Sequence, residues 1–141
     1  MISLSFNAYF NWVFNGDESL FDDNFKVLKK RIEKQKLRLE NFLFFPMDVD
    51  KDVHQHKLYF FNEKWFVTLS VSKEYDLVIS HQSLEGINNI DYEIKPHGHR
   101  VLKARKDNND LFEIKFKGAW PSALKKDYQS RLDEIHELIT D

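Results

Sequence analysis

Residues 57–71 of this 141-residue chain read KLYFFNEKWFVTLSV, a stretch in which two strands and a turn can be recognised. The second half alternates, with Trp65, Val67 and Leu69 on one parity and mostly polar residues between them. A period of two residues predicts a strand with one buried face, and the Asn-Glu pair at 62–63 is a candidate hairpin turn. We therefore expect an antiparallel hairpin in the middle of the chain.

Short alternating runs continue after this hairpin. Apolar residues occupy every second position in 75–79, 90–94 and 112–116, the stretch 100–105 is a further strand candidate, and a strong turn sequence stands at 106–109. Short strands at hairpin spacing are typical of an antiparallel meander with one face in water. The sequence thus predicts a β-meander of five or six strands.

Residues 19–43 show the period of a helix. Ser19 and Asp22 resemble a capping box, and basic side chains follow on the polar face. The apolar stripe recurs at spacings of three, four and seven: Phe21, Phe25, Leu28, Ile32, Leu39 and Phe42. We predict an amphipathic helix of about six turns over 19–43.

The two ends of the chain complete the predicted fold. Residues 2–14 fit either a strand or one face of a helix, whereas Pro121 opens a C-terminal helix. The expected inner face of that helix is Leu124, Tyr128, Leu132, Ile135 and Ile139. We expect a single α+β domain over 1–141, an antiparallel meander with the long N-terminal-half helix and the C-terminal helix packed on one face.

Composition narrows the function classes. The chain has no cysteine, which excludes disulfides and thiolate metal sites and favours a reducing, cytoplasmic location. It has no long apolar run, so we expect no membrane partner. Thirteen Phe, three Trp and five Tyr against four Gly predict an aromatic core and argue against a glycine-rich phosphate loop. The net charge of −2 indicates no particular partner.

Histidines and carboxylates form one candidate metal site. Asp48, Asp50, Asp52, His54 and His56 would all point to one side of an extended chain, and His97 and His99 form a second His-x-His pair. The simpler interpretation is a solvated acidic loop and a second exposed loop. We expect no metal or other cofactor; a metal, if bound, would use His54, His56, His97 and His99.

A nuclease-like pattern is the second candidate. Asp76 in one expected strand and Glu93 with Lys95 in the next could hold a metal ion and a water-activating lysine. Glu113 and Lys115 repeat the same Glu-x-Lys spacing, which favours ordinary cross-strand pairing on a wet face.

The basic stretch 95–106 is the third candidate. It holds five Lys or Arg and no acid, and His97, His99 and Arg100 could supply the acid, base and charge stabilisation of RNA cleavage. The overall pI of about 6.3 argues against a nucleic-acid module, and lysines also protect sheet edges. Nucleic acid therefore stays a less favoured partner.

No Gly-x-Ser-x-Gly, P-loop or dinucleotide motif is present, and a cysteine nucleophile is excluded. We lean against an enzyme and favour a small macromolecule-binding inhibitor, an immunity protein, antitoxin or anti-defence protein that blocks a toxin or nuclease. Its expected binding residues are the exposed aromatics and two cations: Tyr59, Phe61, Phe66, Lys103 and Arg105. The alternative is an RNA-cleaving toxin using 95–106, and a third is a metal-dependent hydrolase.

Overall fold

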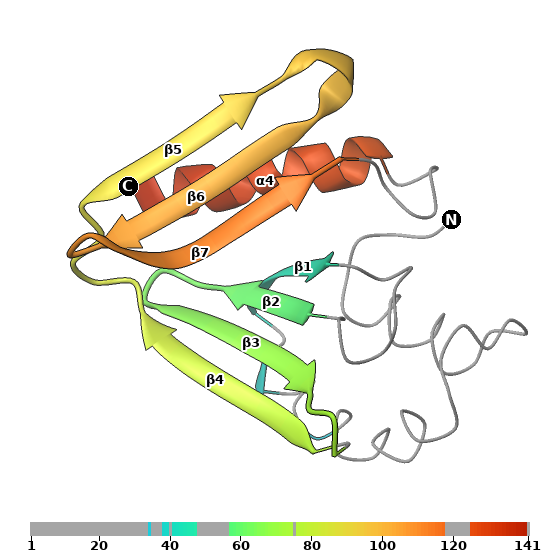
Figure 1. Cartoon of the computed structure of the whole chain (residues 1–141), viewed down its shortest axis with the longest axis vertical. Coiled ribbons are helices and arrows are strands. Elements are labelled where there is room, and N and C mark those ends of the chain that lie inside the picture. The colour runs from blue at the N-terminus through green and yellow to red at the C-terminus, as the bar shows by residue number, and fades with distance from the viewer. Residues whose placement is uncertain are drawn as a thin grey trace, which may run out of the picture.

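The computed structural model describes residues 34, 38, 39, 41–47, 57–74, 76–117 and 125–140. These residues form two antiparallel sheets and one helix (Figure 1). The first sheet, ordered β1-β2-β3-β4, contains β1 (Leu43–Met47), β2 (Lys57–Phe61), β3 (Trp65–Val71) and β4 (Leu77–Ser83). The second, ordered β5-β6-β7, contains β5 (Asn89–Ile94), β6 (Arg100–Lys106) and β7 (Asn109–Phe116), and the helix α4 is Lys125–Thr140.

The predicted α+β class and the antiparallel strands are confirmed, but the single meander is wrong. Each stretch predicted as a strand between residues 57 and 116 overlaps an observed strand. The predicted count of five or six is wrong, because the described residues form seven strands, which the connection 84–88 divides between two sheets. Gly86 lies in this connection with φ +87°, a conformation that glycine adopts without steric cost. The strong turn at 106–109 is confirmed, because Asp107 and Asn108 both have the positive φ that a tight hairpin requires.

An aromatic core joins the first sheet to the second sheet and α4. Phe61 stacks on Phe66 at a centroid distance of 4.9 Å, and both rings contact Phe112 of β7. The expectation that Tyr59, Phe61 and Phe66 are exposed is therefore wrong: they are 7%, 0% and 4% exposed. As alternation requires, these three side chains lie on one face of the first sheet and the other apolar residues lie on its opposite face. The second sheet covers the face that carries the three aromatic rings.

The opposite face of the first sheet is buried as well. Leu58, Phe60, Val67 and Leu69 are at most 5% exposed. The first sheet thus carries apolar residues on both faces, whereas the outer face of the second sheet carries charged residues, as predicted for a meander with one wet face.

Helix α4 packs on the inner side of the second sheet, next to β1 (Figure 1). Tyr128 stacks on Phe116 and meets Phe45 edge-on, while Arg131 donates to the carbonyl of Phe44 at 2.7 Å. The predicted inner-face residues Tyr128, Leu132 and Ile135 are buried. The C-terminal helix is therefore confirmed over the described range, while Pro121 and Leu124 lie outside it.

The predicted helix over 19–43 falls almost wholly outside the described residues, as do residues 2–14. Within it, Lys34 and Arg38 are exposed and Leu39 is buried, which agrees with the predicted polar and apolar faces. The predicted end is wrong, because Phe42 N donates to Leu39 O in a turn and Leu43 already begins β1.

Candidate functional site

The turn between β5 and β6 carries two of the predicted catalytic residues. Pro96–Gly98 forms a short 3₁₀ turn, closed by a 2.8 Å hydrogen bond from Lys95 N to His99 O. His97 has φ +64° and Gly98 φ +78°, so two consecutive residues adopt the left-handed conformation. His97 is exposed at the tip, and its ring lies 6.5 Å from that of His99, measured between centroids.

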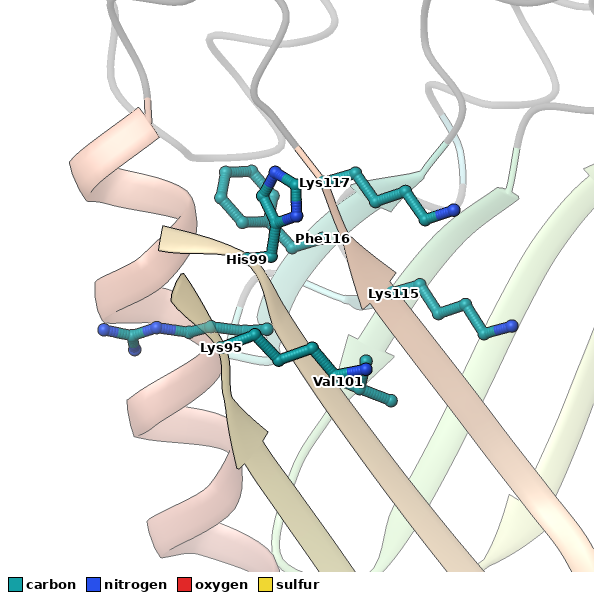
Figure 2. Close-up of a pocket in the computed structure, with 7 residues that line it drawn as sticks. Lys95, His99, Val101, Lys115, Phe116 and Lys117 are labelled. Carbon is teal, nitrogen blue, oxygen red and sulfur yellow. The ribbon is translucent and has the colours of Figure 1, made fainter. Parts of the chain in front are cut away.

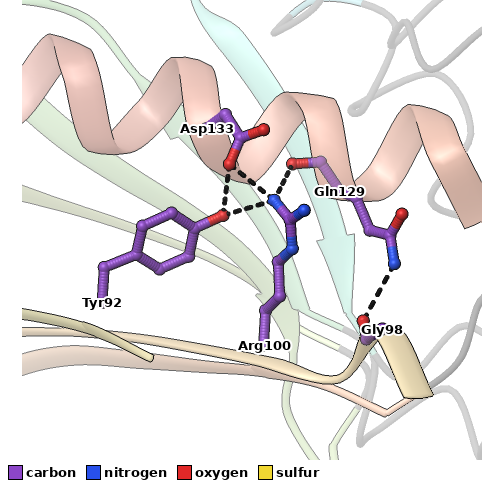
Figure 3. Close-up of polar contacts among 5 residues, drawn as sticks. All are labelled: Tyr92, Gly98, Arg100, Gln129 and Asp133. Atoms are coloured by element: carbon purple, nitrogen blue, oxygen red, sulfur yellow. Dashed lines mark hydrogen bonds and ion pairs between the residues drawn. The ribbon is translucent and has the colours of Figure 1, made fainter. Parts of the chain in front are cut away.

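Arg100, the third predicted catalytic residue, is bound to side-chain and backbone groups of α4. Its Nη1 forms an ion pair with Asp133 and donates to Gln129 O at 3.1 Å and to Tyr92 Oη at 2.8 Å (Figure 3). Tyr92 in turn donates to Asp133 at 2.7 Å. The Arg100 side chain is only 16% exposed, so it anchors the turn to the helix and is not presented to a substrate.

Burial raises the pKa of Tyr92 to about 12, and the hydrogen bond to Asp133 acts in the same direction. The phenol thus stays protonated and serves as a donor to the carboxylate. Gln129 adds a second tie from α4, because its Nε2 donates to Gly98 O at 2.9 Å (Figure 3). Together these contacts fix the His-bearing turn against the helix.

A small basic pocket lies beside this turn, at the end of the second sheet (Figure 2). Its volume is about 240 Å³, and its lining contains no carboxylate: Lys95, His99, Arg100, Val101, Lys115, Phe116 and Lys117. Figure 2 shows the side chains of Lys115 and Lys117 extending in the same direction from the end of β7. This basic pocket combines part of the predicted stretch 95–106 with two lysines that sequence reasoning did not select.

The predicted binding residues Lys103 and Arg105 lie on the outer face of the second sheet and form ion pairs there. Lys103 is 3.6 Å from Asp110 and 3.9 Å from Glu113, and Arg105 Nε is 3.3 Å from Asp110. Lys103 and Glu113 are direct cross-strand neighbours. These two cations therefore stabilise the sheet surface, although each such exposed pair contributes only about 0–1 kcal/mol.

The nuclease-like arrangement is not formed. Asp76 precedes β4 in the first sheet, whereas Glu93 belongs to β5 in the second, and those strands are not paired. Glu93 instead pairs with Lys95 at 3.4 Å, and Glu113 pairs with Lys115 at the same distance. Both pairs join residues two apart in the same segment, so the expected cross-strand pairing holds only for Glu113, whose carboxylate also lies 3.9 Å from Lys103 Nζ on β6.

Only some of the candidate metal ligands lie within the described residues. Asp48, Asp50, Asp52, His54 and His56 lie outside the described residues, so their arrangement stays a prediction. Within the described ranges, no three His, Asp or Glu side chains are grouped so that they could hold a metal ion.

A second candidate surface is the free edge of β4. Among the strands the structure describes, four form sheet edges, and three of them carry features that discourage further pairing. Strands β5 and β7 bear charged side chains, and β1 contains Pro46. The sequence of β4, LVISHQS, has no charged residue and no proline, and Val78 is 44% exposed.

The ladder register shows which backbone groups of β4 are free. Ser72 N donates to Asp76 O and Leu84 N to Lys64 O, which places the bonds to β3 at even-numbered residues of β4. The N–H and C=O groups of Leu77, Ile79 and His81 therefore point away from β3. No described residue hydrogen-bonds to them, while the carbonyl of Ser83 already accepts from Lys106 at 3.3 Å.

Comparison with known proteins adds no information about function: no family model, no curated protein and no solved structure matches this chain. Within the described residues, no helix has the length and apolar character needed to cross a membrane.

Proposed function

We propose that this protein is a small macromolecule-binding inhibitor that blocks a partner protein by pairing with the edge of β4. The observation that carries the proposal is the row of backbone groups at Leu77, Ile79 and His81, on an uncharged strand, to which no described residue hydrogen-bonds. An extended segment of a partner can add to such an edge, with affinity from main-chain hydrogen bonds and specificity from neighbouring side chains.

The class of partner is also part of the proposal, and it rests on the evidence against a catalytic role. Of the predicted catalytic trio, Arg100 is held by α4 and His97 projects from a turn, which favours binding over catalysis. An immunity protein, antitoxin or anti-defence protein acting on a toxin or nuclease in the cytoplasm fits a small chain without cysteine.

The decisive variants are at His81, because its N–H points outward. His81→Pro removes that donor without breaking any bond to β3, and proline is tolerated on the free side of an edge strand. His81→Ala is the matched control, because it removes the side chain and keeps the donor. Partner captured from the native host is identified by mass spectrometry, purified, and assayed for binding and for inhibition of its own activity.

We expect His81→Pro to weaken partner binding by about five- to 150-fold, since losing one main-chain hydrogen bond and leaving the partner group unpaired costs about 1–3 kcal/mol. His81→Ala should bind nearly as the wild type does. Equal binding by all three proteins would remove β4 from the interface. If the pure protein cleaved RNA and His99→Ala abolished the cleavage, the inhibitor proposal would be wrong and the RNA-cleaving toxin would be favoured.

The RNA-cleaving alternative keeps one observation in its favour. His99 lines the basic pocket together with Lys95 and Lys117, so a phosphate there would lie near an imidazole that could donate or accept a proton. The role we expected for Arg100 in that reaction is not available, because its guanidinium is bound to Asp133.

A further inference from the structure

The register of the second sheet brings three basic side chains into one row. Lys95 N donates to His99 O, and the pairing of Arg100 with Phe116 at the end of the ladder places His99 level with Lys117, the residue that follows β7. Directly opposite side chains in antiparallel strands lie about 4.5–5.5 Å apart at Cβ. Lys95, His99 and Lys117 therefore follow one another across the end of the sheet, and Lys115 stands in the next row beside Val101.

The two lysines at the ends of this row stand on either side of His99, so their positive charges flank the imidazole. Two carboxylates offset part of the charge: Glu93 pairs with Lys95 and Glu113 with Lys115. Both pairs are largely exposed and therefore weak. Lys117 forms no ion pair with any residue that the structure describes. A positive excess remains, concentrated where the pocket lies.

The extent of the positive charge limits the size of its ligand. Beyond Val101 the outer face becomes mixed, with Lys103 and Arg105 paired to Asp110 and Glu113. A nucleic-acid backbone needs a continuous track of cations. On the described part of this surface the unpaired positive charge is instead gathered around a pocket of about 240 Å³. That space suits a single phosphate group with a small organic part resting on Val101.

We propose that the basic pocket binds the phosphate group of a small phosphorylated ligand. Lys95, Lys115 and Lys117 supply charge-assisted donors, and the His99 ring contributes an N–H in either tautomer. This site lies on the second sheet, apart from the β4 edge of the first. The proposal does not depend on the inhibitory function.

The test is an amide-resolved NMR titration at constant ionic strength with inorganic phosphate and with a nucleoside monophosphate. We expect saturable shifts confined to amides of residues 95–101 and 115–117, with Kd in the millimolar range or tighter. A tighter Kd for the nucleoside monophosphate would show that the ligand includes the nucleoside, whereas equal values would assign the site to phosphate alone.

The variants Lys95→Gln and Lys117→Gln should each raise Kd about three- to fivefold, the range expected for losing one exposed charge pair. Lys73→Gln, in the exposed turn between β3 and β4, is the matched control and should leave Kd unchanged. The proposal fails if no shift saturates, or if both pocket variants bind as the wild type does. It also fails if only single-stranded RNA binds, with shifts spreading to Lys103 and Arg105.

Discussion

The substitution Phe61→Ala tests the packing of the two sheets directly. Phe61 is fully buried, stacks on Phe66 at 4.9 Å and meets Phe112 of the other sheet at 5.2 Å. Burying about 150–250 Å² of such a ring at about 25 cal/mol per Å² contributes about 4–6 kcal/mol, of which alanine retains a part. We expect Phe61→Ala to lower the free energy of unfolding by about 4 kcal/mol.

Chemical denaturation monitored by tryptophan fluorescence measures this loss, and thermal unfolding should show a decrease in Tm of about 10–15 °C. The control is Ile94→Ala, since Ile94 is 66% exposed and its truncation should cost less than about 1 kcal/mol. Phe61→Leu keeps most of the volume and should fall between them. If Phe61→Ala cost no more than Ile94→Ala, Phe61 would be a surface residue and the arrangement of the sheets would be wrong.

Two further predictions concern the turn held by α4. The pKa of Tyr92 is raised from 10.0 to about 12, so its contribution is fully present below pH 10 and is lost as the pH rises from 10 to 12. After solvent screening this loss should be about 1 kcal/mol, seen as a steeper decline in the wild-type free energy of unfolding than in Tyr92→Phe over that range; parallel curves would contradict it. Gly98→Ala should cost about 2 kcal/mol in the same denaturation assay, more than Gly86→Ala, although both glycines have positive φ. The new Cβ at 98 would lie 2.5 Å from Gln129 Nε2, and moving that amide away breaks its hydrogen bond to Gly98 O; equal losses for the two variants would contradict this.

The strands could be predicted because their signal is local. Alternation over 65–71 and over 112–116, together with a positive-φ turn sequence at 107–108, follows from single strands and single hairpins. Strand β1 gave no such signal, since its LFFPM sequence is apolar throughout and contains a proline. A strand buried on both faces loses alternation, and proline is acceptable at a sheet edge, so the sequence predicted no strand here and the predicted helix extended to the first residue of β1, Leu43.

The burial of Tyr59, Phe61 and Phe66 could not be predicted from the sequence, because it depends on a contact between the two sheets. Alternation shows that two faces exist but not what covers each one. The cover comes from β7 and α4, far along the chain, through Phe112 and Tyr128 among others. The β4 edge was missed for a related reason. Its lack of charge was readable, but a strand is recognised as an edge only when the sheet order is known.

The position of the basic pocket depends on one irregularity in the pairing of β6 with β7, which could not be predicted from the sequence. Counting pairs outward from the turn at 107–108 matches Arg105 with Asp110, and the same count would place His99 opposite Phe116. The ladder shifts by one residue between Ala104 and Arg105, so His99 falls beside Lys117 instead. Because a one-residue slip reverses the faces of a strand, the regular register would have set the imidazole against a core ring and left Lys117 in a different row. The shift thus separates the buried set, Leu102, Ala104 and Ile114, from the basic row, and it links the packing of the core to the placement of the proposed phosphate site.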